Sequence, residues 1–172
     1  MYKSFLILIN DYILTVKKNA FFDIVLPLLL AALCGYLISQ DLLNINKSFL
    51  SNILSVLGII AGFSVTAVAL LSTTDSTNVD RLKKIKTGIT VDGLEISIFR
   101  RFYILISYSV LISFIAILLN IMGYLIPWSK FLSMNWIIIF KCLNLWMIFH
   151  IFFINIRNIT SLYFVYFHET NK

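Results

Sequence analysis

Residues 53–71 read ILSVLGIIAGFSVTAVALL, an unbroken run with no charged side chain. Such a run is long enough to cross a membrane, since a helix needs about 20 apolar residues to span a hydrocarbon core of roughly 30 Å. Three further runs have the same character, at 21–39, 103–125 and 136–156. Backbone groups inside lipid must be paired within their own segment, so each run is predicted to be a helix. The sequence therefore predicts an all-α membrane protein, with four transmembrane helices in a single domain over residues 1–172.

The composition and the absence of sequence motifs argue against an enzyme. Hydrophobic residues make up 60% of the chain and charged residues 13%, which leaves little for a water-soluble domain. Cys34 and Cys142 both fall inside predicted spans, so they are expected to be small buried side chains, neither metal ligands nor a disulfide. The sequence has no phosphate-binding loop, dinucleotide fingerprint, zinc-protease motif or nucleophile elbow. We expect no catalytic residue, no cofactor and no metal.

Lysine and arginine are distributed unevenly between the two sides of the predicted spans. Most of the 14 positive residues lie in the N-terminal segment, the loop 72–101 and the C-terminal tail. The other connections hold only Lys47 and Lys130, while Lys141 lies within the fourth span. Because positive residues mark the cytoplasmic side, both termini and the loop 72–101 are expected to be cytoplasmic.

The N-terminal segment 2–19 has the pattern of an amphipathic helix. At helical spacing its apolar side chains share one face, and these are Phe5, Leu8, Ile9, Tyr12, Ile13 and Val16. We expect this helix to lie in the membrane surface. An alternative is a docking helix for a soluble partner.

The second span carries a stripe of small side chains. Its members recur every three or four residues, and they are Ser55, Gly58, Gly62, Thr66 and Ala69. Gly58 and Gly62 form a GxxxG pair, which allows two helix backbones to approach closely. Three interpretations stay open: packing within the subunit, an interface between subunits, or the lining of a pore.

The loop 72–101 is the only candidate for a water-soluble working part. It opens with a Ser/Thr-rich run at 72–78, and a short basic helix is predicted at 79–86. Its basic cluster consists of Arg81, Lys83, Lys84 and Lys86. These side chains are expected to contact lipid headgroups or to dock a cytoplasmic protein. Direct nucleic-acid binding is not expected, because acidic residues in the same loop offset much of the charge.

Four polar residues at membrane depth are candidate functional positions: Asp23, Lys141, Asn144 and His150. Asp23 lies near the predicted cytoplasmic headgroups, where a snorkelling or capping role is expected, with a proton relay as the alternative. Lys141 lies in the opposite half of the membrane, so its expected partners are Asp41 or water. His150 and Arg157 are the residues closest to the depth of Asp23. The aromatic run 161–167 that follows is expected to form an aromatic belt.

The run 61–71, AGFSVTAVALL, leads into a polar stretch and then into Arg81-Leu82-Lys83-Lys84. Together with the four-span plan, this resembles the membrane subunits of the Kiwa anti-phage defence system, the KwaA family. The resemblance implies a homo-oligomer, a tetramer, that senses phage infection at the bacterial inner membrane. It also implies signalling to a cytoplasmic DNA-binding partner. The alternatives are a bacteriocin-type immunity protein, or a channel-forming or membrane-disrupting effector with Lys141, Asn144 and the stripe along its path.

Cysteine labelling of intact cells tests the orientation. In a background without Cys34 and Cys142, cysteines replacing Lys47 and Lys130 should react with an impermeant maleimide. A cysteine replacing Lys84 should react only after the cells are opened, because it faces the cytoplasm. Labelling of the Lys84→Cys protein in intact cells would reverse the predicted topology.

Overall fold

The computed structural model describes residues 2–73, 77–91 and 93–167, and it contains four helices long and apolar enough to cross a membrane. The four predicted spans are therefore confirmed. They cover Phe21–Ser39, Lys47–Thr73, Ile98–Leu125 and Met134–Thr160. The first span combines a π-helical turn with helix α2 (Leu26–Ser39), and the others belong to α3 (Lys47–Thr73), α5 (Ile98–Leu125) and α6 (Met134–Phe167).

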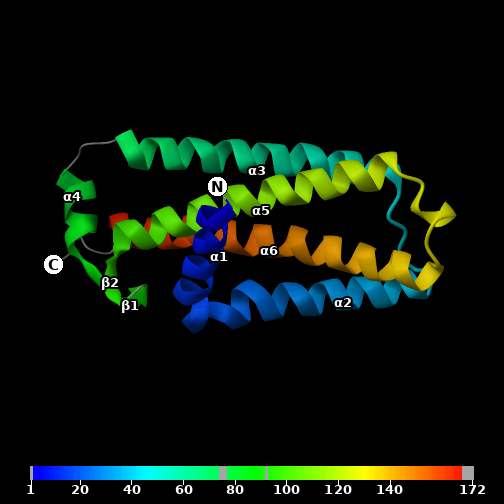
Figure 1. Ribbon diagram of the computed structural model, residues 1–172, viewed down its shortest axis with the longest axis horizontal. Coiled ribbons are helices and arrows are strands. Elements are labelled where there is room, and N and C mark those ends of the chain that lie inside the picture. Colours follow the sequence, from blue (N-terminus) through cyan, green and yellow to red (C-terminus); the bar gives the residue numbers. More distant parts are fainter. Residues whose placement is uncertain (1, 74–76, 92, 168–172) are drawn as a thin grey trace.

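The four long helices run side by side, and α1 (Tyr2–Val16) lies across them (Figure 1). Helix α5 packs against both α3 and α6, and α2 packs against α6. At the α2–α6 contact, a Cβ placed on Gly35 would overlap the sulfur of Cys142. Only a residue without a side chain permits this approach, so Gly35 lets the two helices come close at this level.

Helix α3 turns its small-residue stripe away from the rest of the subunit. Its buried residues are Leu57, Ala61 and Ser64, whereas Ser55, Gly58, Gly62, Thr66 and Ala69 are all exposed. A Cβ added at Gly58 or Gly62 would meet nothing within 4 Å. The interpretation of the stripe as packing within the subunit is therefore wrong, because Leu57 and its neighbours on the opposite face make that contact.

Helix α1 packs one edge of its apolar face into the bundle. Tyr12 and Val16 are buried in a cluster with residues of α5 and α6, and Leu8 and Ile9 pack against that cluster. Phe5 and Ile13 remain exposed. The predicted apolar face is therefore divided between the bundle and the surroundings, and its contact with a membrane surface stays a prediction.

The connection between α3 and α5 forms a small cap, which we call the hairpin end of the molecule. It consists of α4 (Thr77–Lys84) and the antiparallel strands β1 (Lys86–Val91) and β2 (Leu94–Ser97). Gly88 and Gly93 have φ values of +69° and +76°, a conformation that glycine adopts without strain. Helix α4 buries Val79 and Leu82, and it packs against β2 and the start of α5.

The basic helix therefore spans Thr77–Lys84, two residues earlier at each end than the predicted 79–86, and the residues after it form the hairpin of β1 and β2. Residues 74–76 of the predicted Ser/Thr-rich run lie outside the described residues. The run 161–167 is not a separate tail, because α6 continues through it to Phe167.

Candidate functional site

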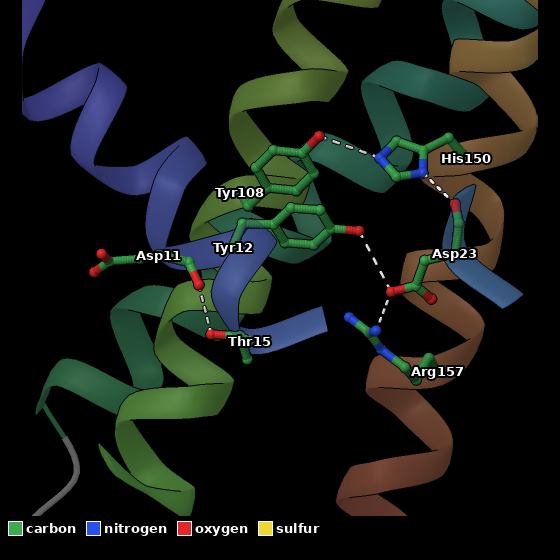
Figure 2. Close-up of polar contacts among 7 residues, drawn as sticks. All are labelled: Asp11, Tyr12, Thr15, Asp23, Tyr108, His150 and Arg157. Atoms are coloured by element: carbon green, nitrogen blue, oxygen red, sulfur yellow. Dashed lines mark hydrogen bonds and ion pairs between the residues drawn. The ribbon is translucent and has the colours of Figure 1, made fainter. Parts of the chain in front are cut away.

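The candidate site is a group of buried polar side chains where α1 crosses the bundle (Figure 2). Its centre is Asp23, which comes from the π-helical turn Phe21–Val25 and has 0% of its surface exposed. The Asp23 carboxylate forms an ion pair with Arg157 of α6, which is 8% exposed. The hydroxyl of Tyr12, on α1, donates to the same carboxylate at 3.3 Å. Two neighbouring segments near the N-terminus and one from α6 thus meet at one buried charge.

Pro27 explains why the backbone of Asp23 takes part as well. In an α-helix, the carbonyl of residue 23 would accept a hydrogen bond from the N–H of residue 27, and proline has no N–H. That carbonyl instead accepts from Nδ1 of His150. A carbonyl can only accept, so Nδ1 must carry the proton. In the neutral ring, Nε2 then accepts from the hydroxyl of Tyr108, at 3.1 Å.

Aromatic stacking holds α1 against α5 and completes the site. The rings of Tyr12 and Tyr108 are nearly parallel, with centroids 3.5 Å apart. Trp146 stacks on the other side of the group, against His150, with centroids 5.5 Å apart. Burial raises the pKa of the Tyr12 hydroxyl well above its usual value, so this hydroxyl stays protonated and serves as a donor to Asp23.

The ion pair is buried without its full complement of hydrogen bonds. In the described part of the chain, Asp23 Oδ1 and the Nε and Nη2 atoms of Arg157 have no hydrogen-bond partner. A second guanidinium, that of the half-buried Arg101, is close enough to interact electrostatically with both charges. Removing two charges from water costs several kcal/mol per ion, so such a pair contributes little net stability. Its role is to fix which surfaces of α1, α2 and α6 face one another.

The expectation that Asp23 snorkels or caps a helix near the headgroups is wrong. The residue does lie at the start of its span, but α1 covers it and Arg157 neutralises it. The sequence predicts that His150 and Arg157 lie near the depth of Asp23 in the membrane, and the structure brings both into contact with it. Sequence reasoning missed the role of Tyr12 and Tyr108, although the spacing between Asp23 and Pro27 could have indicated the free carbonyl.

The other predicted polar residues lie elsewhere in the bundle. Asn144 and Asn120 exchange two amide hydrogen bonds, each of 3.0 Å, between α6 and α5. Lys141 is half-buried, and within the described chain no ion pair joins it to Asp41. Since Asn144 faces inward and the stripe faces outward, the predicted path lined by both does not exist within one subunit.

A second group of hydrogen bonds joins α3, α5 and α6 at a different level of the bundle from the Asn120–Asn144 pair. Asn155 donates to the Ser109 hydroxyl at 2.8 Å, and Ser64 donates to Asn155 at 3.4 Å. These residues hold the long helices in register. Among the described residues, no cluster of three His, Cys, Asp or Glu side chains could hold a metal ion.

The basic cluster of the loop does not form one continuous site. Lys83 and Lys86 line a pocket beside the start of α5, and Arg81 and Lys84 are not part of its lining. All four residues are exposed. The ion pair of Lys83 with Asp80, at 3.6 Å, is likewise exposed.

Neutralising the buried pair should destabilise the fold strongly. Asp23→Asn leaves Arg157 buried without its counter-charge, and Arg157→Gln leaves Asp23 dependent on the half-buried Arg101; each change should cost about 3–5 kcal/mol. The double variant should lose clearly less than the sum of the two single variants. Unfolding in detergent followed by circular dichroism measures these losses.

The exposed pair Asp80–Lys83 is the matched control for this cycle. Asp80→Asn and Lys83→Gln should each change stability by less than about 1 kcal/mol, because water screens an exposed pair. Losses at Asp23 and Arg157 that are equally small, or that simply add, would show that the two charges do not depend on each other.

Comparison with known proteins identifies no relative. A scan against protein-family models found no match, and neither a search of curated proteins nor a search of solved structures found one. The function proposed below therefore depends on the geometry of this chain and on the resemblance described above.

Proposed function

We propose that this chain is a non-enzymatic inner-membrane protein of bacterial anti-phage defence, which senses infection at the membrane and signals to a cytoplasmic DNA-binding partner. The resemblance to the membrane subunits of the Kiwa system suggests this role. The four spans and the charged hairpin end fit it, since they supply a membrane part and a small cap for a partner.

One observation carries the proposal: α1 is tied both to the bundle and to the hairpin end. Tyr12 reaches the buried carboxylate of Asp23. The preceding residue, Asp11, lies 3.8 Å from Arg100, in the first turn of α5. Helix α1 also packs against β1. A displacement of α1 by a change at the membrane surface would therefore alter contacts at the hairpin end directly.

The orientation in this proposal follows from the charge distribution. The hairpin end, with its basic cluster, faces the cytoplasm together with both termini. A cytoplasmic partner with an acidic surface would then meet Arg81, Lys83, Lys84 and Lys86.

The exposed stripe on α3 supports assembly of several copies. Small side chains let the backbone of a second helix approach closely, and among the described residues nothing lies within 4 Å of a Cβ added at Gly58 or Gly62. We propose a homo-oligomer, a tetramer by resemblance, with the stripe in its interface.

A bulky residue in the stripe should therefore break the assembly. Gly62→Leu is expected to shift the protein from oligomer to monomer, because the leucine side chain separates the two backbones. Native mass spectrometry in detergent measures the number of copies. Gly123→Leu is the matched control, since a Cβ at Gly123 in α5 also meets nothing within 4 Å. A monomeric unmodified protein would contradict the proposal.

Charge reversal tests the docking surface. Changing Arg81, Lys83, Lys84 and Lys86 to glutamate should abolish co-purification with the DNA-binding product of a neighbouring gene, most clearly at low salt. The oligomer should persist, because the reversed residues lie outside the spans. Lys47→Glu with Lys130→Glu is the control at the opposite end. Retained binding by a correctly inserted variant would exclude the basic cluster as the docking site.

A further inference from the structure

We infer that the pocket at the hairpin end is a binding site for a phosphate group. The pocket has a volume of about 490 Å³. Three cationic side chains line it, each from a different element: Lys83 from α4, Lys86 from β1 and Arg100 from α5. Cations that converge on one concavity repel each other unless an anion lies between them. The inference does not depend on the proposed function.

The contacts of these cations within the chain leave donors free for a ligand. Lys83 has an exposed ion pair with Asp80, at 3.6 Å, and lies over the ring of Phe99, 5.5 Å from its centroid. Lys86 donates to the backbone carbonyl of Glu95, an uncharged acceptor, at 3.2 Å. Arg100 lies 3.8 Å from Asp11. Since an ammonium has three N–H donors and a guanidinium has five, each side chain keeps donors for an anion.

The one carboxylate in the lining does not neutralise the pocket. Glu95 accepts a hydrogen bond from the backbone N–H of Gly88 at 2.8 Å, so its side chain is engaged by the opposite strand of the hairpin. The lining itself therefore holds three cations and one carboxylate, and Asp80 and Asp11, which lie outside the lining, offset part of that charge from its margin. An anionic ligand is therefore favoured over a neutral or cationic one.

The start of α5 adds to this preference. Ser97 caps the helix by accepting from the N–H of Arg100 at 3.2 Å, and it also lines the pocket. The N-terminus of a helix carries a partial positive charge, and α5 is a long helix. Phosphate oxygens are commonly bound by such a terminus together with basic side chains.

The position of the pocket suits the phosphate of a phospholipid headgroup. Arg100 connects the pocket to α1, the helix that lies across the bundle where the first span begins. Leu94, also in the lining, is 67% exposed and offers an apolar contact beside the charges. A soluble phosphate compound has the same oxyanion chemistry, so the experiment must separate the two sources.

Ligand-induced stabilisation of the purified full-length protein tests the site. The shift in melting temperature is measured in detergent with added phosphatidylglycerol, with diacylglycerol as the phosphate-free lipid reference, and separately with inorganic pyrophosphate. The pocket variant combines Lys83→Gln, Lys86→Gln and Arg100→Gln. The control variant removes the same charge from exposed lysines outside both the pocket and the basic cluster, with Lys17→Gln, Lys47→Gln and Lys130→Gln. The double variant Lys83→Gln/Lys86→Gln serves if the loss of Arg100 prevents folding.

We expect phosphatidylglycerol to stabilise the wild type and the control, and to bind the pocket variant about tenfold more weakly. Stabilisation by pyrophosphate alone, lost in the same variant, would assign the site to a soluble phosphate compound. Equal responses of the pocket and control variants, or no response of the wild type to either anion, would overturn the inference. None of these outcomes depends on a partner protein, so they are separate from the test of docking.

Discussion

The buried carboxylate of Asp23 is the constraint on which the arrangement of the other helices depends. An ionised group without exposure must have a counter-charge, and Arg157 near the end of the fourth span supplies it. This pairing fixes the level at which the first span meets the fourth. It also requires a cover, because an open site would let water replace the contacts, and α1 provides that cover through Tyr12. The short helix α1 thus helps to stabilise the buried charge, because it excludes water and donates a hydrogen bond.

The irregular start of the first span also contributes to the contacts of Asp23. A π-helical turn and a proline within one segment free backbone groups that lipid could not satisfy. Such a defect is tolerated where other protein groups complete the hydrogen bonds, and His150 does so for the carbonyl of Asp23. Asp23 therefore engages α6 twice, with its side chain at Arg157 and with its backbone at His150.

The spans could be predicted from sequence because length and hydropathy alone decide whether a segment can cross a membrane. Which face of α3 turns inward could not be predicted from sequence. Lipid tails are as apolar as the protein interior, so exposing either face to lipid has the same hydrophobic free energy. The stripe can be recognised in the sequence, but its outward direction depends on Leu57 packing against residues of α5 and α6 on the opposite face. The environment of Asp23 could not be predicted either, since its counter-charge comes from a distant part of the chain and its cover depends on α1 folding back across the bundle. At the hairpin end, the positive φ of Gly88 and Gly93 agrees with local sequence, but the convergence of Lys83, Lys86 and Arg100 requires the tertiary fold.

If signalling proceeds through α1, the contacts around the buried charge also set the free energy that a signal must supply to displace this helix. Withdrawal of α1 removes the Tyr12 hydroxyl from Asp23, the stacking of Tyr12 on Tyr108 and the contact of Asp11 with Arg100. A two-state element must gain about 5.5 kcal/mol of differential interaction to move from 1:99 to 99:1. A change in membrane composition or tension that acts on a single copy must supply that whole amount through one short helix. Several copies that release their α1 helices together would reach it more easily, because each copy contributes its own differential interaction to a shared transition. The exposed stripe on α3 would join the copies. The contacts of α1 with Asp23, Tyr108 and Arg100 would set the free energy that the copies must overcome together, so the two features are complementary.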